Sequence, residues 1–276
     1  MKVGLIAGSG RFPILVAEEG RRRDVEFVAL GIPGVTDPAL EKLTPVQYFK
    51  LGQLDKPIKV LKDAGVTRAV MAGKVQHASL FGGIMPDLRA GKLLMRLADK
   101  RTDTILKAVA DEFSKDGIEL VSSATYLGHL LVPAGPLTRR SPDAAELADI
   151  RLGWKAAKAV AGFDIGQTVV VKDGAVVAVE GMEGTDACIL RARDIAASQG
   201  KKTTRLSVVK VAKPKQDMRF DIPVIGLDSL KVFAAASVSA LAVEAGTTLI
   251  FDRAEFVRKA DEQKLAVLGC PPEGPQ

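Results

Sequence analysis

Short apolar runs alternate with helix-like stretches through the first half of the chain, and this alternation restricts the possible fold more than any other feature. Several runs have the length and apolar character of buried strands, at 2–7, 26–31, 68–72 and 118–121. Apolar residues at helical spacing lie between them, at 14–23, 54–64, 87–98 and 102–115. This alternation predicts an α/β domain with a parallel sheet and helices on both faces.

The second half predicts a second α/β domain. The segment 132–142 contains three prolines and is the best linker, so we expect domains over 1–135 and 136–276. Val-rich runs flank Lys172-Asp173-Gly174, which predicts a β-hairpin. The other expected elements are a helix at 142–161 with Ser141 as N-cap and Pro142 in its first turn, a helix at 185–198, a strand at 206–211, an Ala-rich helix at 228–243, a strand at 247–251, and a final helix and strand.

Composition narrows the class of protein. The chain has 276 residues, of which 47% are hydrophobic and 26% charged, which is typical of a globular protein and excludes disorder. Its formal charge of +6 is dispersed, which suits anionic ligands or a membrane surface and does not suit a nucleic-acid binder. The run at 21–23 is interpreted as a solvated helix end, with contact to anionic headgroups as the alternative.

The cysteines and the apolar stretches predict a cytoplasmic protein. Cys188 and Cys270 are far apart and form no CxxC motif, so we expect free thiols. No signal peptide is recognisable at the start of the sequence. The longest Ala/Val-rich stretch, at 232–243, is shorter than the roughly 20 apolar residues needed to span a bilayer.

Gly8-Ser9-Gly10 follows the first predicted strand and leads into a helix. Backbone N–H groups at such a turn form an anion site that suits phosphate. Pro13 stands where a dinucleotide fingerprint has its third glycine, and the second strand ends without an acidic residue, so NAD binding is disfavoured. A tight turn without a ligand is the alternative. Lys74, after the strand at 68–72, either points into the same crevice or is an exposed loop lysine.

Two polar loops of the second half are candidates for chemistry. The segment 180–186 has three acidic residues separated by glycines at the start of a helix, which suits a hard cation such as magnesium or, alternatively, a simple helix cap. The segment 213–223 contains cations, an amide and carboxylates between prolines. These groups suit the binding of a diphosphate and the activation of water. The alternative is a solvated connector. His77, His129 and the cysteines show no apparatus for covalent catalysis.

Several motifs resemble the LpxI family of UDP-2,3-diacylglucosamine pyrophosphatases. They are GLIAGSGRFP at the start, RTDTILKAVADEF at 101–113, DIGQTVVVKDGAVVAVEGMEGTDACI at 164–189, KPKQDMRFDIPVIG at 213–226 and EAGTTLIFDR at 244–253. They follow one another in order across nearly the whole chain. The central motif and QDMRFDIPVIG are specific, whereas the glycine turn alone is not.

The resemblance implies a metal-dependent hydrolase of lipid A biosynthesis. Such enzymes have a Rossmann-like N-terminal domain and a C-terminal catalytic domain, and they use Mg²⁺ to cleave UDP-2,3-diacylglucosamine into lipid X (2,3-diacylglucosamine 1-phosphate) and UMP. The family's essential aspartate matches Asp221. The expected partner is this lipid substrate, without nucleic acid, while peripheral contact with the inner membrane and a homodimer are left open.

Together, the residues and the resemblance give a set of predicted site residues. Asp221 and Asp186 are expected to be catalytic, and Asp221, Glu183 and Asp186 are the expected metal ligands. Substrate contacts are expected from Gly8, Ser9, Gly10, Lys74, Asp103, Thr185, Lys213, Gln216 and Arg219. The alternatives are a module that binds a nucleotide sugar or lipid phosphate without catalysis and, on the glycine turn alone, a Rossmann oxidoreductase.

Overall fold

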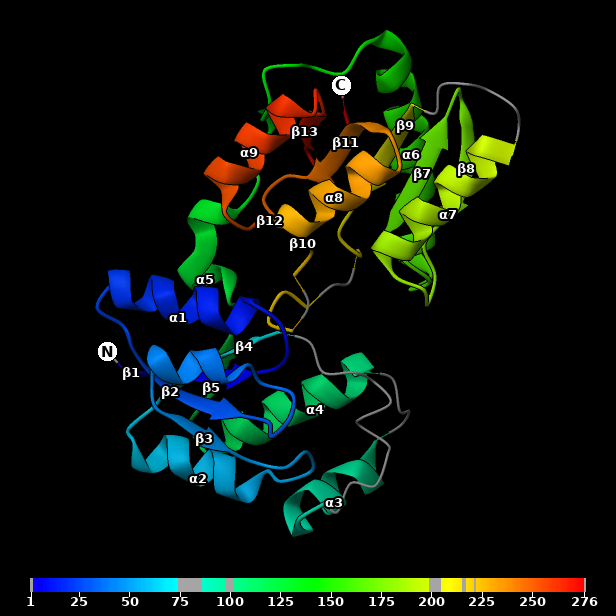
Figure 1. The fold of residues 1–276 in the computed structure, drawn as a ribbon. Coiled ribbons are helices and arrows are strands. Elements are labelled where there is room, and N and C mark those ends of the chain that lie inside the picture. Colours follow the sequence, from blue (N-terminus) through cyan, green and yellow to red (C-terminus); the bar gives the residue numbers. More distant parts are fainter. Residues whose placement is uncertain are drawn as a thin grey trace. The chain divides into compact units, whose positions relative to one another are not determined.

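A computed structural model of the chain describes residues 2–73, 86–97, 102–198, 205–214, 217–220 and 222–275, with only the backbone of 102 and 103. The chain forms two compact units (Figure 1). Unit 1 comprises Met1–Gly128 and Asp217–Asp221, and unit 2 comprises His129–Gln216 and Ile222–Gln276. Among the described residues, no helix is both long and apolar enough to cross a bilayer.

Unit 1 contains a five-stranded parallel sheet with the order β3-β2-β1-β4-β5. The parallel sheet is therefore confirmed, and β3 is an edge strand that the sequence patterns did not indicate. The strand order reverses direction between β1 and β4, which is where open α/β sheets bind ligands. The strands are β1 (Lys2–Ala7), β2 (Glu26–Gly31), β3 (Val46–Tyr48), β4 (Arg68–Ala72) and β5 (Glu119–Val121).

Helices cover both faces of this sheet, as predicted (Figure 1). Helices α1 (Phe12–Arg22) and α5 (Ala124–Leu127) lie on one face, where the rings of Phe27 and Tyr126 pack edge to face. On the other face, Ile58, Leu93 and Phe113 join one apolar core. These residues belong to α2 (Asp55–Asp63), α3 (Leu88–Arg96) and α4 (Thr102–Lys115). Two short 3₁₀ helices are η1 (Pro38–Lys42), within unit 1, and η3 (Gly128–Leu130), where the chain passes from unit 1 to unit 2.

Unit 2 contains a six-stranded mixed sheet with the order β6-β13-β11-β9-β7-β8. Strands β9, β11 and β13 are parallel, and β7 pairs antiparallel with β8 and β9. The predicted hairpin is confirmed: Asp173 and Gly174 both have positive φ, as its two-residue turn requires. The strands are β6 (Gly135–Pro136), β7 (Thr168–Lys172), β8 (Ala175–Val179), β9 (Leu206–Lys210), β11 (Val238–Glu244) and β13 (Ala266–Cys270).

The expected linker at 132–142 contributes to this sheet. Its Gly135–Pro136 pair forms β6, which runs antiparallel to β13, and Val132 is fully buried. A separate two-stranded pairing joins β10 (Val224–Ile225) to β12 (Leu249–Ile250). The compact units therefore divide the chain between Gly128 and His129, while the domain limits 1–135 and 136–276 stay a prediction.

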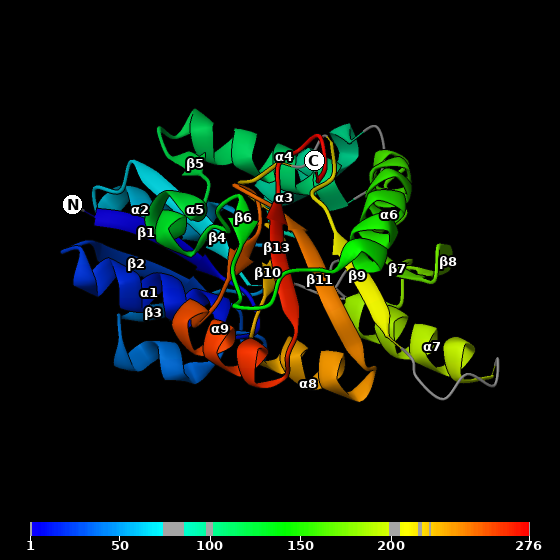
Figure 2. The same ribbon diagram turned by 90° about the horizontal axis from the view of Figure 1, so that it is seen from above.

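Helices also cover both faces of the sheet of unit 2 (Figure 2). Helix α6 (Ala144–Gly162) packs Ile150 and Trp154 on one face. The other face is covered by α7 (Thr185–Ser198), α8 (Leu227–Ala235) and α9 (Arg253–Glu262). Helix α7 lies where the sequence predicted it, and Cys188 and Cys270 are free and buried.

Two details of the prediction for unit 2 are wrong. The expected helix at 228–243 ends at Ala235, because Ser237 adopts a left-handed conformation and Val238–Glu244 forms the inner strand β11. An apolar run that is buried on both faces has no periodicity to distinguish a strand from a helix. The predicted cap of α6 is also wrong, since Asp143 caps this helix in place of Ser141, in a capping box with Glu146.

Glu146 is the centre of a buried ion network in unit 2. Its carboxylate accepts hydrogen bonds from Arg140 at 2.7 and 3.0 Å, from Arg205 at 2.9 Å and from the Asp143 N–H at 2.9 Å. Burial by itself would raise the pKa of Glu146, but the hydrogen bonds from Arg140 and the Asp143 N–H outweigh it and lower this pKa to about 2. The network therefore stabilises the folded state through an ionised carboxylate.

The Glu146→Gln variant should lower the free energy of unfolding of unit 2 by about 2–3 kcal/mol near neutral pH. Because the folded pKa lies below the ordinary 4.5, this stabilisation is present above that pH and disappears as the pH falls toward 2. The difference between wild type and variant should therefore shrink in acid. Urea unfolding followed by the fluorescence of Trp154, the chain's one tryptophan, reports on this unit.

Glu255→Gln is the matched control. Glu255 also has a pKa lowered to about 2, chiefly by a hydrogen bond from Arg258, but it lies at the surface of α9. Exposed ion pairs contribute little to stability, so this variant should unfold almost as wild type does. A destabilisation by Glu146→Gln that does not change with pH would contradict the ionic role of Glu146.

Candidate functional site

The turn after β1 is anchored at the carboxyl edge of the unit 1 sheet. The Gly8 N–H donates to the Ala72 carbonyl at 2.8 Å, which joins the ends of β1 and β4. The Thr36 hydroxyl donates to the Ala7 carbonyl at 2.6 Å and accepts from the Ile32 N–H at 2.8 Å, which fixes the end of β2 on the other side. The predicted anion turn therefore lies at the point where the strand order reverses direction.

Glycines permit the close packing of this turn. Gly73 has φ +91°, and a Cβ placed there would lie 2.6 Å from the Ser9 carbonyl oxygen. Gly10 has φ +86°, a conformation that residues with side chains rarely adopt. Gly8, Ser9, Gly10 and Gly73 are thus brought together in unit 1. Lys74 follows directly in the sequence but lies outside the described residues.

The N-terminus of α1 provides the positive end of a helix dipole, which attracts an anion. Arg11 is the N-cap and makes no side-chain capping hydrogen bond, and the first turn contains no acidic residue. The positive end of the helix dipole is therefore not offset by a carboxylate within this turn. Pro13, which replaces the third glycine of a dinucleotide fingerprint, is buried in the first turn of α1, where proline fits a helix well.

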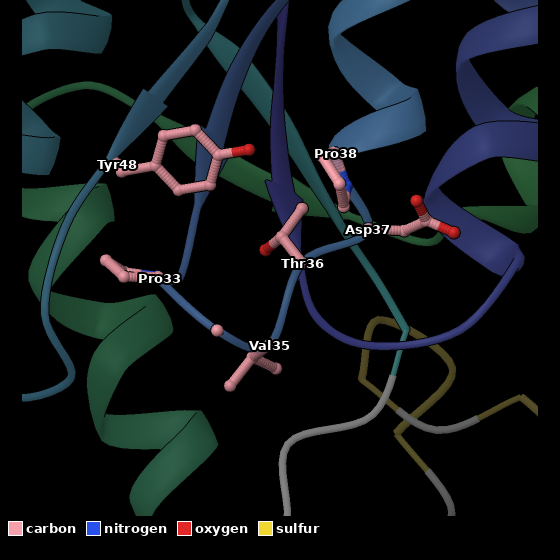
Figure 3. Close-up of a pocket in the computed structure, with 7 residues that line it drawn as sticks. Pro33, Val35, Thr36, Asp37, Pro38 and Tyr48 are labelled. Carbon is pink, nitrogen blue, oxygen red and sulfur yellow. The ribbon is translucent and has the colours of Figure 1, made fainter.

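A hollow of about 590 Å³ lies beside the end of β2 (Figure 3). The ring of Tyr48 stands on one side and Thr36 and Pro38 on the other. The Tyr48 hydroxyl donates to Glu41 at 2.7 Å, and this hydrogen bond raises the pKa of Tyr48. The lining residues include no cation, so we assign the hollow no phosphate contact. They are Pro33, Gly34, Val35, Thr36, Asp37, Pro38 and Tyr48.

Unit 2 brings a buried lysine to the start of α7. Lys210, at the carboxyl end of β9, is 7% exposed and donates from Nζ to the Thr185 hydroxyl at 2.9 Å. Thr185 in turn donates to Glu180 Oε1 at 2.9 Å, and its hydroxyl lies 3.4 Å from that of Thr168. Glu180 also accepts from the Gln167 N–H at 3.3 Å. We call Thr168, Glu180, Thr185 and Lys210 the Lys210 cluster.

The Lys210 cluster combines a cation, two hydroxyls and the carboxylate of Glu180 beside the start of α7. Ammonium groups, hydroxyls and helix N-termini bind phosphate oxygens, and Glu180 and Asp186 place negative charge next to them. Thr185 was expected at the site, and the structure places it in this cluster. Lys210 was missed, because in the sequence it is the last residue of an apolar strand. Its contact with Thr185 spans 25 residues, so no local pattern could have revealed it.

The two expected metal ligands of this loop are exposed. Glu183 accepts from Arg191 at 2.5 Å and from the Gly181 N–H at 3.0 Å, and the bond from Arg191 is the main cause of its lowered pKa. Asp186 lies in the first turn of α7, on the same loop-to-helix junction. Within the described ranges, no group of three or more acidic, histidine or cysteine residues is arranged to hold a metal ion.

The segment 213–223 contributes to both units. Lys213, in unit 2, pairs with Asp164 at 2.5 Å. Arg219, in unit 1, forms a two-pronged pair with Asp217, which lowers the pKa of Asp217 and raises that of Arg219. Gln216, Asp221 and His77 lie outside the described residues, as does the side chain of Asp103, so these predictions remain untested.

The similarity of this chain to known proteins extends over nearly its whole length. A family model described as the LpxI N-terminal domain matches residues 2–130, and one described as the LpxI C-terminal domain matches residues 133–268. A relative from Caulobacter vibrioides, named UDP-2,3-diacylglucosamine pyrophosphatase LpxI, is 35% identical over 277 residues, covering 99% of this chain and 98% of the relative. A solved structure titled CobK precorrin-6A reductase covers 100% of this chain and 90% of its own at 12% identity, but its TM-score of 0.30 is too low to support an argument.

Proposed function

Because this chain belongs to the LpxI family, we propose that it hydrolyses the pyrophosphate bond of UDP-2,3-diacylglucosamine. It is accordingly an enzyme, a hydrolase of a phosphoric anhydride in lipid A biosynthesis. The structural observation that carries the proposal is the Lys210 cluster, where a buried ammonium group meets a hydroxyl at a helix N-terminus. Such a site neutralises the charge that a diphosphate concentrates.

The reaction adds one water across the P–O–P linkage. An oxygen of water forms a bond to one phosphorus, the bridging oxygen leaves with the other phosphate, and the products are 2,3-diacylglucosamine 1-phosphate and UMP. We assign Asp221 the role of orienting this water and accepting its proton, with Asp186 as a second carboxylate. Lys210 and Thr185 would hold phosphate oxygens, and we assign the same role to Lys213 and Arg219 once they exchange their present carboxylate partners.

Magnesium is part of the proposal, and the donor chemistry of the exposed loop suits it. Glu183 and Asp186 offer carboxylate oxygens, the ligands that Mg²⁺ prefers, and Asp221 would add a third. Glu183 is engaged by Arg191, so its use as a ligand requires that Arg191 be displaced. When bound, the ion would offset the negative charge on the diphosphate oxygens.

Chelation of divalent cations should decrease UMP release by roughly 100-fold or more, and added Mg²⁺ should restore it. The assay follows UMP from detergent-solubilised UDP-2,3-diacylglucosamine. Trp154 fluorescence should show that the chain remains folded during chelation. Full activity after exhaustive chelation would refute the metal dependence and leave the hydrolase activity itself standing.

The competing proposal is a module that binds a nucleotide sugar or lipid phosphate without chemistry. The turn at Gly8–Gly10 and the Lys210 cluster would serve such a module equally well. Tight UDP binding that is independent of Mg²⁺, without any UMP formed from the intact substrate, would favour it. We further propose that the enzyme works in the cytoplasm, at the inner membrane from which its substrate must be drawn, whereas a homodimer stays a prediction.

A further inference from the structure

Helix α3 presents an apolar and basic stripe to solvent. Leu88, Lys92 and Met95 follow one another at helical spacing, so their side chains share one face of the helix. Leu88 is 84% exposed and Met95 is 81% exposed, which is unusual for apolar side chains of this size. The opposite face buries Ala90 and Leu93 in the core of unit 1. The exposed stripe is therefore not needed to hold α3 in place.

The charges on α3 are all positive. Its sequence LRAGKLLMR contains three basic residues and no acidic one. Arg89 pairs with Glu112 and Asp116 on the buried side. Lys92 and Arg96 are exposed beside the apolar stripe, and no carboxylate of the described residues pairs with them. The outer face of α3 thus combines protruding apolar groups with positive charge that no carboxylate of the described residues offsets.

Two other surfaces of the described residues lack this combination. In the run at 21–23, Glu19 pairs with both Arg22 and Arg23 and offsets one of the three positive charges, and no large apolar residue of α1 is strongly exposed. The most exposed apolar residues of unit 2 are Phe163, Ile165 and Met182, which adjoin Asp164 and Glu183 in the sequence. An anionic partner therefore fits α3 better than either of these surfaces.

We propose that the outer face of α3, formed by Leu88, Lys92, Leu94, Met95 and Arg96, docks this chain on an anionic lipid bilayer. The inference rests on the proposed function, because a diacylated substrate resides in a membrane. Leu88 and Met95 enter the boundary between headgroups and acyl chains, while Lys92 and Arg96 meet lipid phosphates. The apolar area is small, so binding is reversible and weakens with salt.

Vesicle sedimentation with the full chain tests the docking surface. The chain should bind vesicles that contain phosphatidylglycerol, should bind phosphatidylcholine vesicles much more weakly, and should be released by high salt. The Lys92→Glu/Arg96→Glu variant should lower the partition coefficient about tenfold or more. The Leu88→Ser/Met95→Ser variant should lower it about tenfold, because two apolar groups no longer enter the bilayer.

Matched variants elsewhere provide the controls. Lys59→Glu/Lys155→Glu changes the net charge equally at exposed positions of α2 and α6, and Leu152→Ser/Val176→Ser removes two partly exposed apolar groups of unit 2. Both should bind vesicles as wild type does. UMP release from detergent-solubilised substrate, which needs no bilayer, should be normal in all four variants and tests the proposed function separately.

Several outcomes would overturn the docking surface. Failure of the wild-type chain to sediment with anionic vesicles would contradict the proposal, as would α3 variants that bind these vesicles as well as the controls do. A change of sedimentation coefficient in Leu88→Ser/Met95→Ser, with vesicle binding intact, would identify a second copy of the chain as the occupant. Loss of turnover in detergent with normal vesicle binding would assign α3 to the acyl chains of the substrate.

Discussion

Replacing Asp221 with alanine is expected to lower kcat for UMP release by roughly 1000-fold, because a carboxylate that orients and deprotonates water contributes about 10²–10⁴ to the rate. KM should change much less, since the cations that hold the diphosphate remain. The measurement is the release of UMP from detergent-solubilised UDP-2,3-diacylglucosamine in the presence of Mg²⁺. Thermal unfolding of the variant by calorimetry shows whether the protein remains folded.

The residues on either side of position 221 are anchored. Phe220 packs against the apolar core of unit 1, and the guanidinium of Arg219 lies 4.8 Å above its ring. Ile222 is buried, and the carbonyl of Pro223 accepts a hydrogen bond from the Leu249 N–H at 2.9 Å within unit 2. Phe220 and Ile222 are therefore each held within their own unit.

Asp217→Ala is the matched control for Asp221→Ala. It removes a carboxylate from the same segment and releases Arg219 from its pair, but it leaves the proposed reacting carboxylate in place. Because a partly exposed ion pair contributes about 1 kcal/mol or less, we expect an effect of about fivefold at most. Near-normal turnover by a folded Asp221→Ala protein would refute the role assigned to Asp221.

Local patterns predicted β1, β2, β4, β5 and helices α1 to α4 of unit 1, because the apolar runs and helical spacings of these elements lie within their own residues. The edge strand β3 has three residues, two of them exposed, and forms no such run. Local residues also predicted the hairpin at Asp173-Gly174, where two positive φ values call for these residue types. The prediction of a helix over 228–243 was wrong because Val238–Glu244 is buried on both faces and has no local periodicity. Its strand conformation depends on pairing with β9 and β13. Nonlocal pairing leaves no trace in a local pattern.

The site shows the same division. Gly10 and Gly73 could be expected at a turn of this kind, and their positive φ values bear this out. The role of Lys210 depends on its contact with Thr185 from another element, and Glu183 is engaged by Arg191 from two turns along α7. The charged residues of the loop at 180–186 were recognisable from the sequence. The residues that form hydrogen bonds and ion pairs with them are determined by the packing of unit 2 and could not be predicted from the sequence.

The Lys210→Met variant should lower kcat/KM by about 100-fold or more, because one preformed donor to a phosphate oxygen is lost from a buried site. Methionine keeps much of the length and volume of the side chain, so the packing around β9 is largely retained. The hydroxyl of Thr185 would keep its bond to Glu180 and lose the ammonium group 2.9 Å away. Activity in the presence of Mg²⁺ and unfolding by Trp154 fluorescence are measured side by side.

Lys172→Met separates an anion-binding role from a structural one. Lys172 is 5% exposed and pairs with Asp173 at 3.4 Å, so it is a buried lysine of the same sheet. Thr168 of β7 is paired in register with Lys210 of β9. Lys172 lies four residues farther along β7, so it is about 13 Å from Thr168, at the other end of the strand. Both variants should lose stability to a similar degree, but only Lys210→Met should lose activity. Equal loss of activity in both would make Lys210 a structural residue and remove the Lys210 cluster from the mechanism.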